Sequence, residues 1–350
     1  MKRITFVLNS LEVGGTEKQL LKLVELISKR FYLNLYVFSL GDLKPHFENL
    51  NIKINFCKFK YLQIFHFLIF LIFNKTDIYH FFLPKSYILG GIFTYFSKKK
   101  KIMSRRSLNN YHRKFLYLSL ILERFLHRKM DFLIANCDTI VNQLISDEGA
   151  DKSKVHLVRN FIIKSKTKFK RKQKKIVNFI YVANFIGYKR HLKLINYCKS
   201  LETKRVWNLY LFGKDKFGLL KKIKSQIYLN NLTSKIKVVS NVSDMKDFYK
   251  AMDFAVCTSS EEGSSNFLLE SINSGLPILA FDVGGNKDFC NDKNGYLIQE
   301  NDDLLFKKKL EEMIDSDKLN KMGKESKRIC IDIFNNKKSL SKLIKIYNNN

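Results

Sequence analysis

The chain has 350 residues, 45% of them hydrophobic, and a formal net charge of +31 at pH 7. This length is large for a single core and suits two domains. Such a positive charge is typical of proteins that bind nucleic acid or an anionic membrane surface, but Lys is abundant along the whole chain and the sequence holds no recognisable nucleic-acid motif, so charge alone does not assign a nucleic-acid partner.

The cysteines and the apolar segments bear on location. Six cysteines are scattered without a C-x-x-C pair, which favours reduced thiols in a cytoplasm over a disulfide or zinc framework. Residues 1–9 begin directly with a strand-like run, and we expect no signal peptide there. The mostly apolar run 61–73 is shorter than the roughly 20 residues that span a bilayer, so it predicts a buried or interfacial helix.

Strand and helix patterns alternate in the first half of the chain. Residues 4–9 predict the first strand, and a loop with Gly14 and Gly15 leads into an amphipathic helix. Such glycines let backbone approach a ligand, or form only a tight turn. Further strands are predicted at 33–39, 52–56, 78–82, 101–104, 132–135 and 155–158, and helices at 61–73, 85–97 and 111–129. The alternation predicts a parallel sheet covered by helices, which is one Rossmann-like domain.

Polar residues in this domain have both a functional and a structural interpretation. Arg105 and Arg106 follow a predicted strand; they can bind a phosphate of an anionic acceptor or donor bidentately, or can simply be exposed. His80, inside a predicted strand, is expected to be packed. The helix 111–129 mixes basic residues with apolar and aromatic ones, which suits either an anionic membrane surface or a packed helix with a basic outer face.

A basic segment then divides the chain. Residues 164–175 hold eight Lys or Arg in twelve positions and little to bury, which predicts a solvated linker. We therefore expect an N-terminal domain at 1–163 and a C-terminal domain at 176–336. Residues 337–350 are expected to form a helix that can return to brace the first domain.

The alternation restarts in the second half and predicts another Rossmann-like domain. Its strands are predicted at 177–183, 209–212, 236–239, 254–257 and 276–280. The loop after the first of these strands contains Lys189 and Arg190, which are either ligand-binding cations or solvated charges.

The most informative stretch is 258–286. Ser264 or Ser265 can cap a helix over about 266–274, and this helix follows a buried strand. Glu262 lies in the loop before the helix and Glu270 lies inside it, so two carboxylates flank a helix N-terminus whose N–H groups suit a phosphate. Carboxylates accept hydrogen bonds from sugar hydroxyls. The simplest ligand with both groups is a nucleotide sugar.

The order of these residues resembles a known signature. Glu262, seven residues and Glu270, followed by Ser-Gly-Leu-Pro-Ile and Asp282-Val-Gly-Gly, resemble glycosyltransferase family 4, retaining enzymes of GT-B fold. The resemblance implies an α/β architecture of two Rossmann-like domains facing each other across a cleft. The first would be the acceptor side and the second the nucleotide-sugar donor side. The implied reaction transfers a sugar with retention to a glycan or lipid-linked acceptor, as in bacterial polysaccharide biosynthesis.

The resemblance also implies roles for residues at the donor. Glu262 would lie by the donor sugar, where the reaction takes place, and Glu270 would hold the ribose. The backbone N–H groups at Asn266 and Phe267 would face the phosphates.

The glycine and lysine loops match the family in part. Gly14 and Gly15 resemble its glycine loop, whose backbone faces the donor phosphates. Lys189 matches the lysine that grips the leaving diphosphate, while Asn184 takes the place of the family's arginine and Arg190 can supply the missing charge. A histidine that many members carry near the reacting centre is absent from the stretch after strand 101–104. Neither a metal nor a cofactor is expected, because cations and helix amides stabilise the departing diphosphate in this family.

Two other classes stay open. A nucleotide-sugar epimerase can have a related two-domain architecture, although the Glu262 and Glu270 pattern argues against it. A basic nucleic-acid-binding protein would bind polyanions with a steep salt dependence. On the resemblance we expect a cytoplasmic enzyme that is peripheral on the inner face of the membrane, as helix 111–129, the run 61–73 and the net charge suggest.

Overall fold

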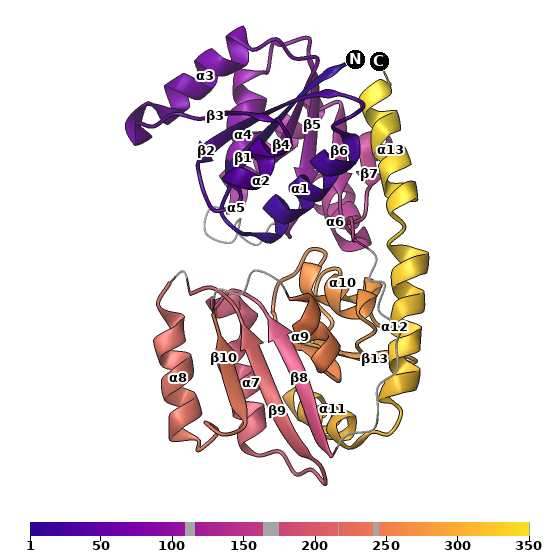
Figure 1. Cartoon of the computed structure of the whole chain (residues 1–350). Helices are drawn as coiled ribbons and strands as arrows, with labels where there is room; N and C mark the ends of the chain where they lie inside the picture. Colours follow the sequence, from indigo (N-terminus) through magenta and orange to yellow (C-terminus); the bar gives the residue numbers. More distant parts are fainter. Residues whose placement is uncertain (109–115, 164–174, 216, 241–244, 350) are drawn as a thin grey trace. The chain divides into compact units, whose positions relative to one another are not determined.

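The computed structural model describes residues 1–108, 116–163, 175–215, 217–240 and 245–349 (Figure 1). The chain divides into two compact units, each built on one parallel sheet. The first unit is Met1–Phe161 together with Asn336–Asn350, and the second is Ile162–Asn335. Most of the predicted linker, 164–174, lies outside the described residues. The acceptor and donor roles of the two domains stay predictions.

The first unit has a seven-stranded parallel sheet in the order β3-β2-β1-β4-β5-β6-β7. Its strands are β1 (Arg3–Ser10), β2 (Tyr32–Ser39), β3 (Lys53–Asn55), β4 (Ile78–Phe82), β5 (Lys100–Arg105), β6 (Phe132–Ala135) and β7 (Val155–Leu157). Its α-helices are α1 (Gly15–Ile27), α2 (Lys44–Glu48), α3 (Gln63–Phe73), α4 (Pro84–Phe93), α5 (Leu116–Lys129), α6 (Asp138–Asn142) and α13 (Asn336–Asn348). Short helical turns lie at Lys60–Leu62, Gln143–Asp147 and Lys152–Lys154.

Both faces of this sheet are covered. Side chains alternate along β1, so that Ile4 and Phe6 join the core on one face and Val7 joins the core on the other. The first core takes in residues of α1, α2 and α13, and the second takes in residues of α3, α4 and α6. Parallel strands that are buried on both faces explain the continuous apolar runs in the sequence.

The C-terminal helix α13 packs into the first unit through Tyr347. This ring is fully buried, and its hydroxyl lies 2.8 Å from Nδ1 of His80. The other ring nitrogen of His80 lies 2.8 Å from the hydroxyl of Ser104. Burial lowers the pKa of His80 well below its usual value, so the ring is neutral. His80 is packed between its neighbours, as the sequence predicted.

The second unit has a six-stranded parallel sheet in the order β10-β9-β8-β11-β12-β13. Its strands are β8 (Ile176–Val182), β9 (Val206–Phe212), β10 (Ile236–Val239), β11 (Phe254–Cys257), β12 (Ile278–Phe281) and β13 (Gly295–Ile298). Its α-helices are α7 (His191–Lys199), α8 (Leu219–Leu229), α9 (Lys246–Ala251), α10 (Asn266–Asn273), α11 (Asp303–Asp315) and α12 (Leu319–Ile333), with short turns at Gly187–Lys189 and Asn286–Asp288.

Two of the boundaries that differ from the predicted ones have identifiable reasons. Strand β12 begins at Ile278 rather than 276, because the N–H of Leu276 bonds back to the carbonyl of Ser271 and Pro277 has no N–H. Helix α4 ends at Phe93, where the hydroxyl of Thr94 bonds back to the carbonyl of Gly90, rather than at 97. Helix α5 begins at Leu116, and the predicted start at 111 lies outside the described residues.

In the described part of the chain, no helix combines the length and the apolar character that crossing a membrane requires.

Candidate functional site

The site of the second unit is organised by the N-terminus of α10. This helix begins at Asn266, directly after a loop from β11, and the hydroxyl of Ser265 accepts a hydrogen bond from the N–H of Leu268 at 3.4 Å. It ends at Asn273, and Gly275 beyond the C-cap residue has a φ of +74°, which suits glycine. Helix geometry leaves the first-turn N–H groups, including that of Phe267, without acceptors inside the helix, so this end favours an anion.

The loop before α10 is tied to the loop after β8. The hydroxyl of Tyr181 donates to the carbonyl of Lys189 at 2.9 Å, and that of Thr258 lies 3.2 Å from the same carbonyl. The N–H of Ser260 donates to the carbonyl of Tyr188 at 2.9 Å. These bonds join two loops that are about 70 residues apart in the sequence, following parallel strands that pair side by side.

The joined loops bring Lys189 and Glu262 together. Nζ of Lys189 lies 2.5 Å from Oε1 of Glu262, and the two side chains keep 15% and 11% of their surface exposed. Burial acts to lower the pKa of Lys189, but the carboxylate of Glu262 outweighs it and leaves the pKa raised. The ammonium is therefore charged at neutral pH, partly accessible, and held by a carboxylate.

Arg190, the next residue, has a different partner. It takes the left-handed conformation, with φ of +52° and ψ of +39°, between the turn and α7. One guanidinium nitrogen lies 2.5 Å from Oε1 of Glu300, which follows β13. If Arg190 compensates for Asn184 by binding a ligand, its guanidinium must contact the ligand and Glu300 together or leave Glu300.

Glu270 is positioned from behind by Tyr249 of α9. The phenol hydroxyl donates to Oε2 of Glu270 at 3.0 Å, and Glu270 itself is half-buried. Burial, and after it the charge of Glu270, raises the pKa of Tyr249 well above its usual value, so the phenol stays protonated as a donor. Tyr249 could not be predicted from the sequence, since a tyrosine 21 residues away in a separate helix belongs to no motif.

Gly284 belongs to the Asp282-Val-Gly-Gly signature, and the sequence predicts no role for it. Its φ is +55°, and a Cβ there would overlap the backbone carbonyl of Glu262. The neighbouring Gly285 donates its N–H to the carbonyl of Gly263 at 2.8 Å. The glycine pair therefore lets the loop after β12 support the backbone that carries Glu262.

In the first unit, Gly14 and Gly15 form the start of α1. Gly14 is the N-cap residue with φ of −141°, and neither glycine has a positive φ. The nearest obstacle to a Cβ at Gly14 is the movable carboxylate of Glu17. The backbone conformation therefore does not require glycine at these two positions. A close approach of their backbone to a ligand stays a prediction.

Arg105 differs from the expected picture of an accessible cation. It is 2% exposed, and one guanidinium nitrogen lies 2.6 Å from Glu123 and 3.0 Å from Glu148. Tyr87 donates its hydroxyl to Glu123 at 3.0 Å. Arg105 therefore fastens β5 to α5 inside the unit, and a ligand could reach it only if this cluster opened.

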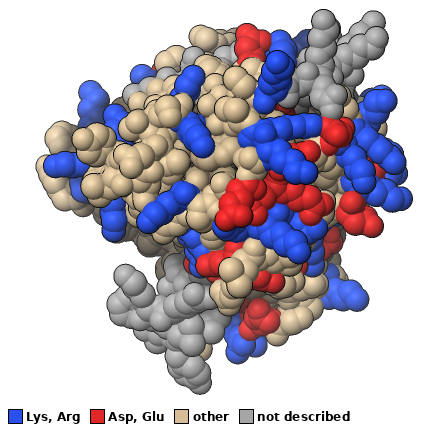
Figure 2. Space-filling view, turned by 90° about the horizontal axis from the view of Figure 1, so that it is seen from below, with Lys and Arg blue, Asp and Glu red and all other residues tan. Residues whose placement is uncertain are grey.

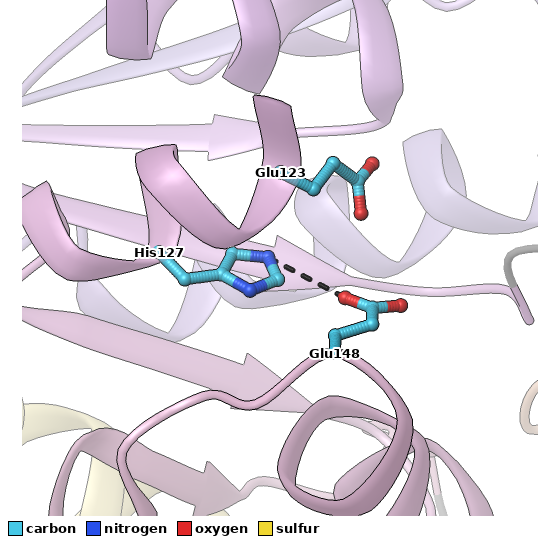
Figure 3. Close-up of side chains that lie close together, drawn as sticks. All are labelled: Glu123, His127 and Glu148. Carbon is cyan, nitrogen blue, oxygen red and sulfur yellow. Dashed lines mark ion pairs between the residues drawn. The ribbon is translucent and has the colours of Figure 1, made fainter. Parts of the chain in front are cut away.

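The same cluster contains His127, which lies 3.5 Å from Glu148 (Figure 3). Glu123, His127 and Glu148 could each offer one ligand atom to a metal ion, and these atoms lie within 4.8 Å of one another. The guanidinium of Arg105 already contacts both carboxylates, and its charge opposes a cation there. Burial, opposed by Arg105 and reinforced by Glu123, raises the pKa of Glu148 to about 8. Two carboxylates thus share one arginine, and one of them carries a proton near neutral pH.

Arg106 is half-buried. Its guanidinium lies over the ring of Phe82, 5.4 Å from the centroid, and donates to Oδ1 of Asn160 at 2.9 Å. Burial lowers its pKa to about 10, which leaves it charged at neutral pH. A contact between Arg106 and an acceptor or donor stays a prediction.

Known proteins match this chain in sequence and in fold. Residues 162–329 match the sequence model of a family described as Glycosyl transferases group 1, and this stretch contains the Lys189, Glu262 and Glu270 site. The amylovoran biosynthesis glycosyltransferase AmsD of Erwinia amylovora is 29% identical over 44% of this chain and 42% of its own length. A UDP-Gal:alpha-D-GlcNAc-diphosphoundecaprenol alpha-1,3-galactosyltransferase of Escherichia coli is 30% identical over 33% of this chain and 30% of its own. The chain thus spans less than half the length of these curated relatives.

Solved structures match over the whole chain. The structure of Anabaena Alr3699/HepE in complex with UDP and glucose superposes with a TM-score of 0.80 at 16% identity, covering 99% of both chains. This likeness shows the fold, which is GT-B, as the sequence predicted.

Proposed function

We propose that the protein is a glycosyltransferase that moves a sugar from a nucleotide-sugar donor to a glycan or lipid-linked acceptor, with retention of configuration, in surface polysaccharide biosynthesis. The observation that carries the proposal is the contact between Lys189 and Glu262 beside the N-terminus of α10, within the stretch that matches the glycosyltransferase family. The relatives AmsD, by its name a biosynthetic glycosyltransferase, and the galactosyltransferase of Escherichia coli support the reaction class.

The proposed roles follow from charge and placement. Lys189 meets the negative charge that develops on the leaving diphosphate, together with the N–H groups of Asn266 and Phe267 at the start of α10. Glu262 orients Lys189 and accepts hydrogen bonds from the donor sugar. Glu270, held by Tyr249, accepts from the ribose hydroxyls. No step in this scheme needs a metal ion.

The donor nucleotide is proposed to be a uridine diphosphate sugar. The similar Anabaena structure holds UDP and glucose, and the relative from Escherichia coli is named for UDP-Gal and a diphosphoundecaprenol-linked acceptor. An acceptor of that kind would place this protein at the inner face of a membrane as a peripheral enzyme.

Nucleotide binding tests the proposal directly. We would measure thermal unfolding with UDP, GDP and CMP, because a nucleotide that binds only the folded state raises the unfolding temperature by mass action. UDP should give the largest increase. No increase with any of the three would contradict the proposal.

Two variants divide the roles of the carboxylates. Glu270→Gln should weaken UDP binding with a smaller effect on turnover at saturating donor, whereas Glu262→Gln should mainly lower turnover. Glu311→Gln is the matched control and should change neither, because this half-buried glutamate of α11 in the same unit pairs with Lys307. Equal UDP affinity in both site variants, with equal loss of turnover, would refute this division.

A further inference from the structure

Helix α3 exposes an apolar face. Two of its side chains point inward: Phe67 is fully buried and Leu71 is 5% exposed. Large hydrophobic side chains on its other side and in the turn before it are exposed by between 39% and 81%. They include Tyr61, Ile64, Phe65, Ile69, Ile72 and Phe73. Figure 1 shows α3 at the periphery of the first unit, beside the edge of the sheet that ends in β3.

This helix lacks the polar outer face that surface helices usually have. Gln63–Phe73 contains no Asp, Glu, Lys or Arg. Helices that are apolar all round are normally buried, and contiguous exposed apolar patches mark interaction sites. The outer face therefore needs a partner.

The inner face of α3 is already occupied, so the helix cannot bury its outer face by turning. The ring of Tyr36 lies 4.7 Å from that of Phe67 and 4.8 Å from that of Phe70. The hydroxyl of Tyr36 lies 3.1 Å from Nδ1 of His66, and the side-chain amide of Gln63 donates to a β2 carbonyl at 2.6 Å. These contacts fix which side of α3 faces outward.

The charged residues that flank α3 most closely in the sequence are lysines. The sequence from Asn49 to Thr76 contains no Asp or Glu, whereas Lys58 and Lys60 precede the helix and Lys75 follows it. Lys85 adds to this group: burial, and after it the charge of Lys60, lowers its pKa. An apolar helix with lysines at both ends suits a surface that offers anionic groups above hydrocarbon.

The same asymmetry holds for whole units. The first unit has 30 Lys and Arg against 12 Asp and Glu, a net +18, whereas the second unit without the segment 164–175 has 25 against 20, a net +5. Figure 2 shows one face of the molecule on which Asp and Glu lie among Lys and Arg. The unit that carries α3 is thus the one with the large unbalanced positive charge.

We propose that the outer face of α3 is a docking surface for an anionic lipid bilayer, with the apolar side chains inserted at the headgroup boundary and the flanking lysines on the headgroups. This docking proposal deepens the proposed function and rests on it, because a lipid-linked acceptor gives the enzyme a reason to bind a membrane. The helix lies in the interface and does not span it, because its 11 residues extend only about 16 Å against a hydrocarbon core of about 30 Å. A second copy of the chain is a poorer occupant, since pairing through α3 would bring two sets of like charges together.

Vesicle co-sedimentation tests the surface. The wild type should bind vesicles of phosphatidylcholine with about 30% phosphatidylglycerol more tightly than vesicles of pure phosphatidylcholine. Added salt should weaken the binding to the anionic vesicles. The triple variant Phe65→Ser, Ile69→Ser and Ile72→Ser should bind the anionic vesicles at least about tenfold more weakly. The triple variant Lys58→Gln, Lys60→Gln and Lys75→Gln should lose about fivefold per lysine on anionic vesicles only.

A matched control removes exposed apolar side chains of the second unit: Tyr228→Ser, Leu229→Ser and Leu304→Ser, at positions that are 73%, 74% and 85% exposed. This variant should bind vesicles like the wild type. Every replaced side chain on α3 is exposed, so circular dichroism should show the variants folded.

Tryptophan fluorescence gives a second measurement. The only native tryptophan, Trp207, is buried in the second unit and provides a constant background. Phe65→Trp should show a blue-shifted emission on anionic vesicles and quenching by brominated lipid, whereas Leu304→Trp should show neither.

Three results would overturn the proposal. The first is an α3 serine variant that binds vesicles as tightly as the wild type. The second is a wild type that does not prefer anionic vesicles. The third is a wild type that forms a dimer and does not bind vesicles, while the serine variant is a monomer, which would assign α3 to a second copy. Failure of UDP binding with intact, α3-dependent vesicle binding would instead contradict the proposed transferase alone.

Discussion

Lys189 and Glu262 form the contact from which the proposed chemistry follows. The two residues are 73 positions apart, and their side chains meet because Tyr181, Thr258 and Ser260 bond the two loops together through backbone carbonyls. In the absence of a donor, Glu262 holds the ammonium in place. A diphosphate at the start of α10 would compete with Glu262 for it.

The loss of Lys189 should therefore be severe. We expect Lys189→Ala to lower turnover by an amount equivalent to about 2.7–4 kcal/mol of transition-state stabilisation, the usual effect of removing one donor to a developing anion. Arg190→Ala should have a smaller effect, because Arg190 is paired with Glu300. The measurement is the rate of sugar transfer at saturating donor.

The double variant tests whether Arg190 shares the task. If it does, Lys189→Ala with Arg190→Ala is worse than the sum of the single changes. Lys193→Ala, which removes a cation paired with Asp303 in the same unit, is the control and should transfer at a near-normal rate. Near-normal turnover in the double variant would mean that this loop does not stabilise the leaving group.

Gly284 supports Glu262 from the opposite side. Gly284→Ala places a methyl group against the carbonyl of Glu262 at a φ of +55°, so it should cost about 1–3 kcal/mol of stability and also lower turnover. Gly187→Ala is the control, since a Cβ at Gly187 meets nothing within 4 Å. Thermal unfolding and transfer rates for both variants check this, and an unchanged Gly284→Ala protein would show that the loop after β12 adapts freely.

The sequence predicted which residues are candidates for the site, but it did not predict the contacts between them. Glu262 and Glu270 could be singled out as candidates because their spacing and the helix start between them are local features. The contact of Lys189 with Glu262 and that of Tyr249 with Glu270 depend on which strands pair, which spacing does not encode. Arg105 was mistaken for an accessible cation because its partners, Glu123 and Glu148, lie on later elements.

At the scale of elements, α5 is fastened to β5 by a buried cluster that should respond to pH. The pKa of Glu148 is about 8 in the folded protein, above its ordinary value of 4.5. Between these values the folded state binds more protons than the unfolded state, so this group makes the free energy of unfolding fall as pH rises from about 4.5 to about 8. Arg105, Glu123, His127 and Asp147 face or neighbour the same carboxyl group and modify the size of the effect.

The prediction is a difference between variants. Glu148→Gln keeps the shape of the protonated acid but cannot ionise. Its free energy of unfolding should therefore fall less than that of the wild type between about pH 5 and about pH 8, where the folded and unfolded states bind different numbers of protons. Urea unfolding at several pH values measures this. Glu48→Gln, an exposed glutamate of the same unit, should follow the wild type. Parallel pH curves for Glu148→Gln and the wild type would contradict the protonated state.

Helix α13 completes the core of the first unit. Tyr347→Ala should cost about 3–5 kcal/mol of stability, as other buried aromatic truncations do, while Tyr347→Phe removes only the bond to His80 and should cost about 0.5–1.5 kcal/mol. Urea unfolding is the measurement, with Tyr228→Ala at an exposed position as the control. A Tyr347→Ala protein as stable as the wild type would show that α13 contributes little to the core.

Most strands could be predicted within one or two residues, because buried parallel strands are short apolar runs between polar loops. Strand β13, Gly295–Ile298, was not predicted, since its four residues begin with glycine and include the half-exposed Tyr296. The run 61–73 was expected as a buried or interfacial helix, and α3 has one buried and one exposed apolar face. Periodicity could not separate the two faces, because the helix is apolar all round.

At the scale of the whole molecule, the GT-B fold followed from two rounds of strand and helix alternation and from one signature. The sequence was interpreted through the net charge of the whole chain, which does not show how the charge divides between the units. Once the residues are assigned to units, the excess of positive charge belongs largely to the first unit and to the segment 164–175. Most of the excess in the first unit lies in residues 1–161, which hold 26 Lys and Arg against 12 Asp and Glu, and residues 336–350 add four lysines.

That return of the chain has a consequence for synthesis. A ribosome delivers Met1–Phe161 first, but the core of this unit lacks Leu343, Ile346 and Tyr347 until the second unit has been made. Since domains generally fold as units while the chain emerges, Ile162–Asn335 has all of its helices and strands available before the first unit has its last helix, α13. The half that begins the chain is therefore the last to mature, and a nascent chain stopped before α13 leaves uncovered the core residues that Leu343, Ile346 and Tyr347 pack against.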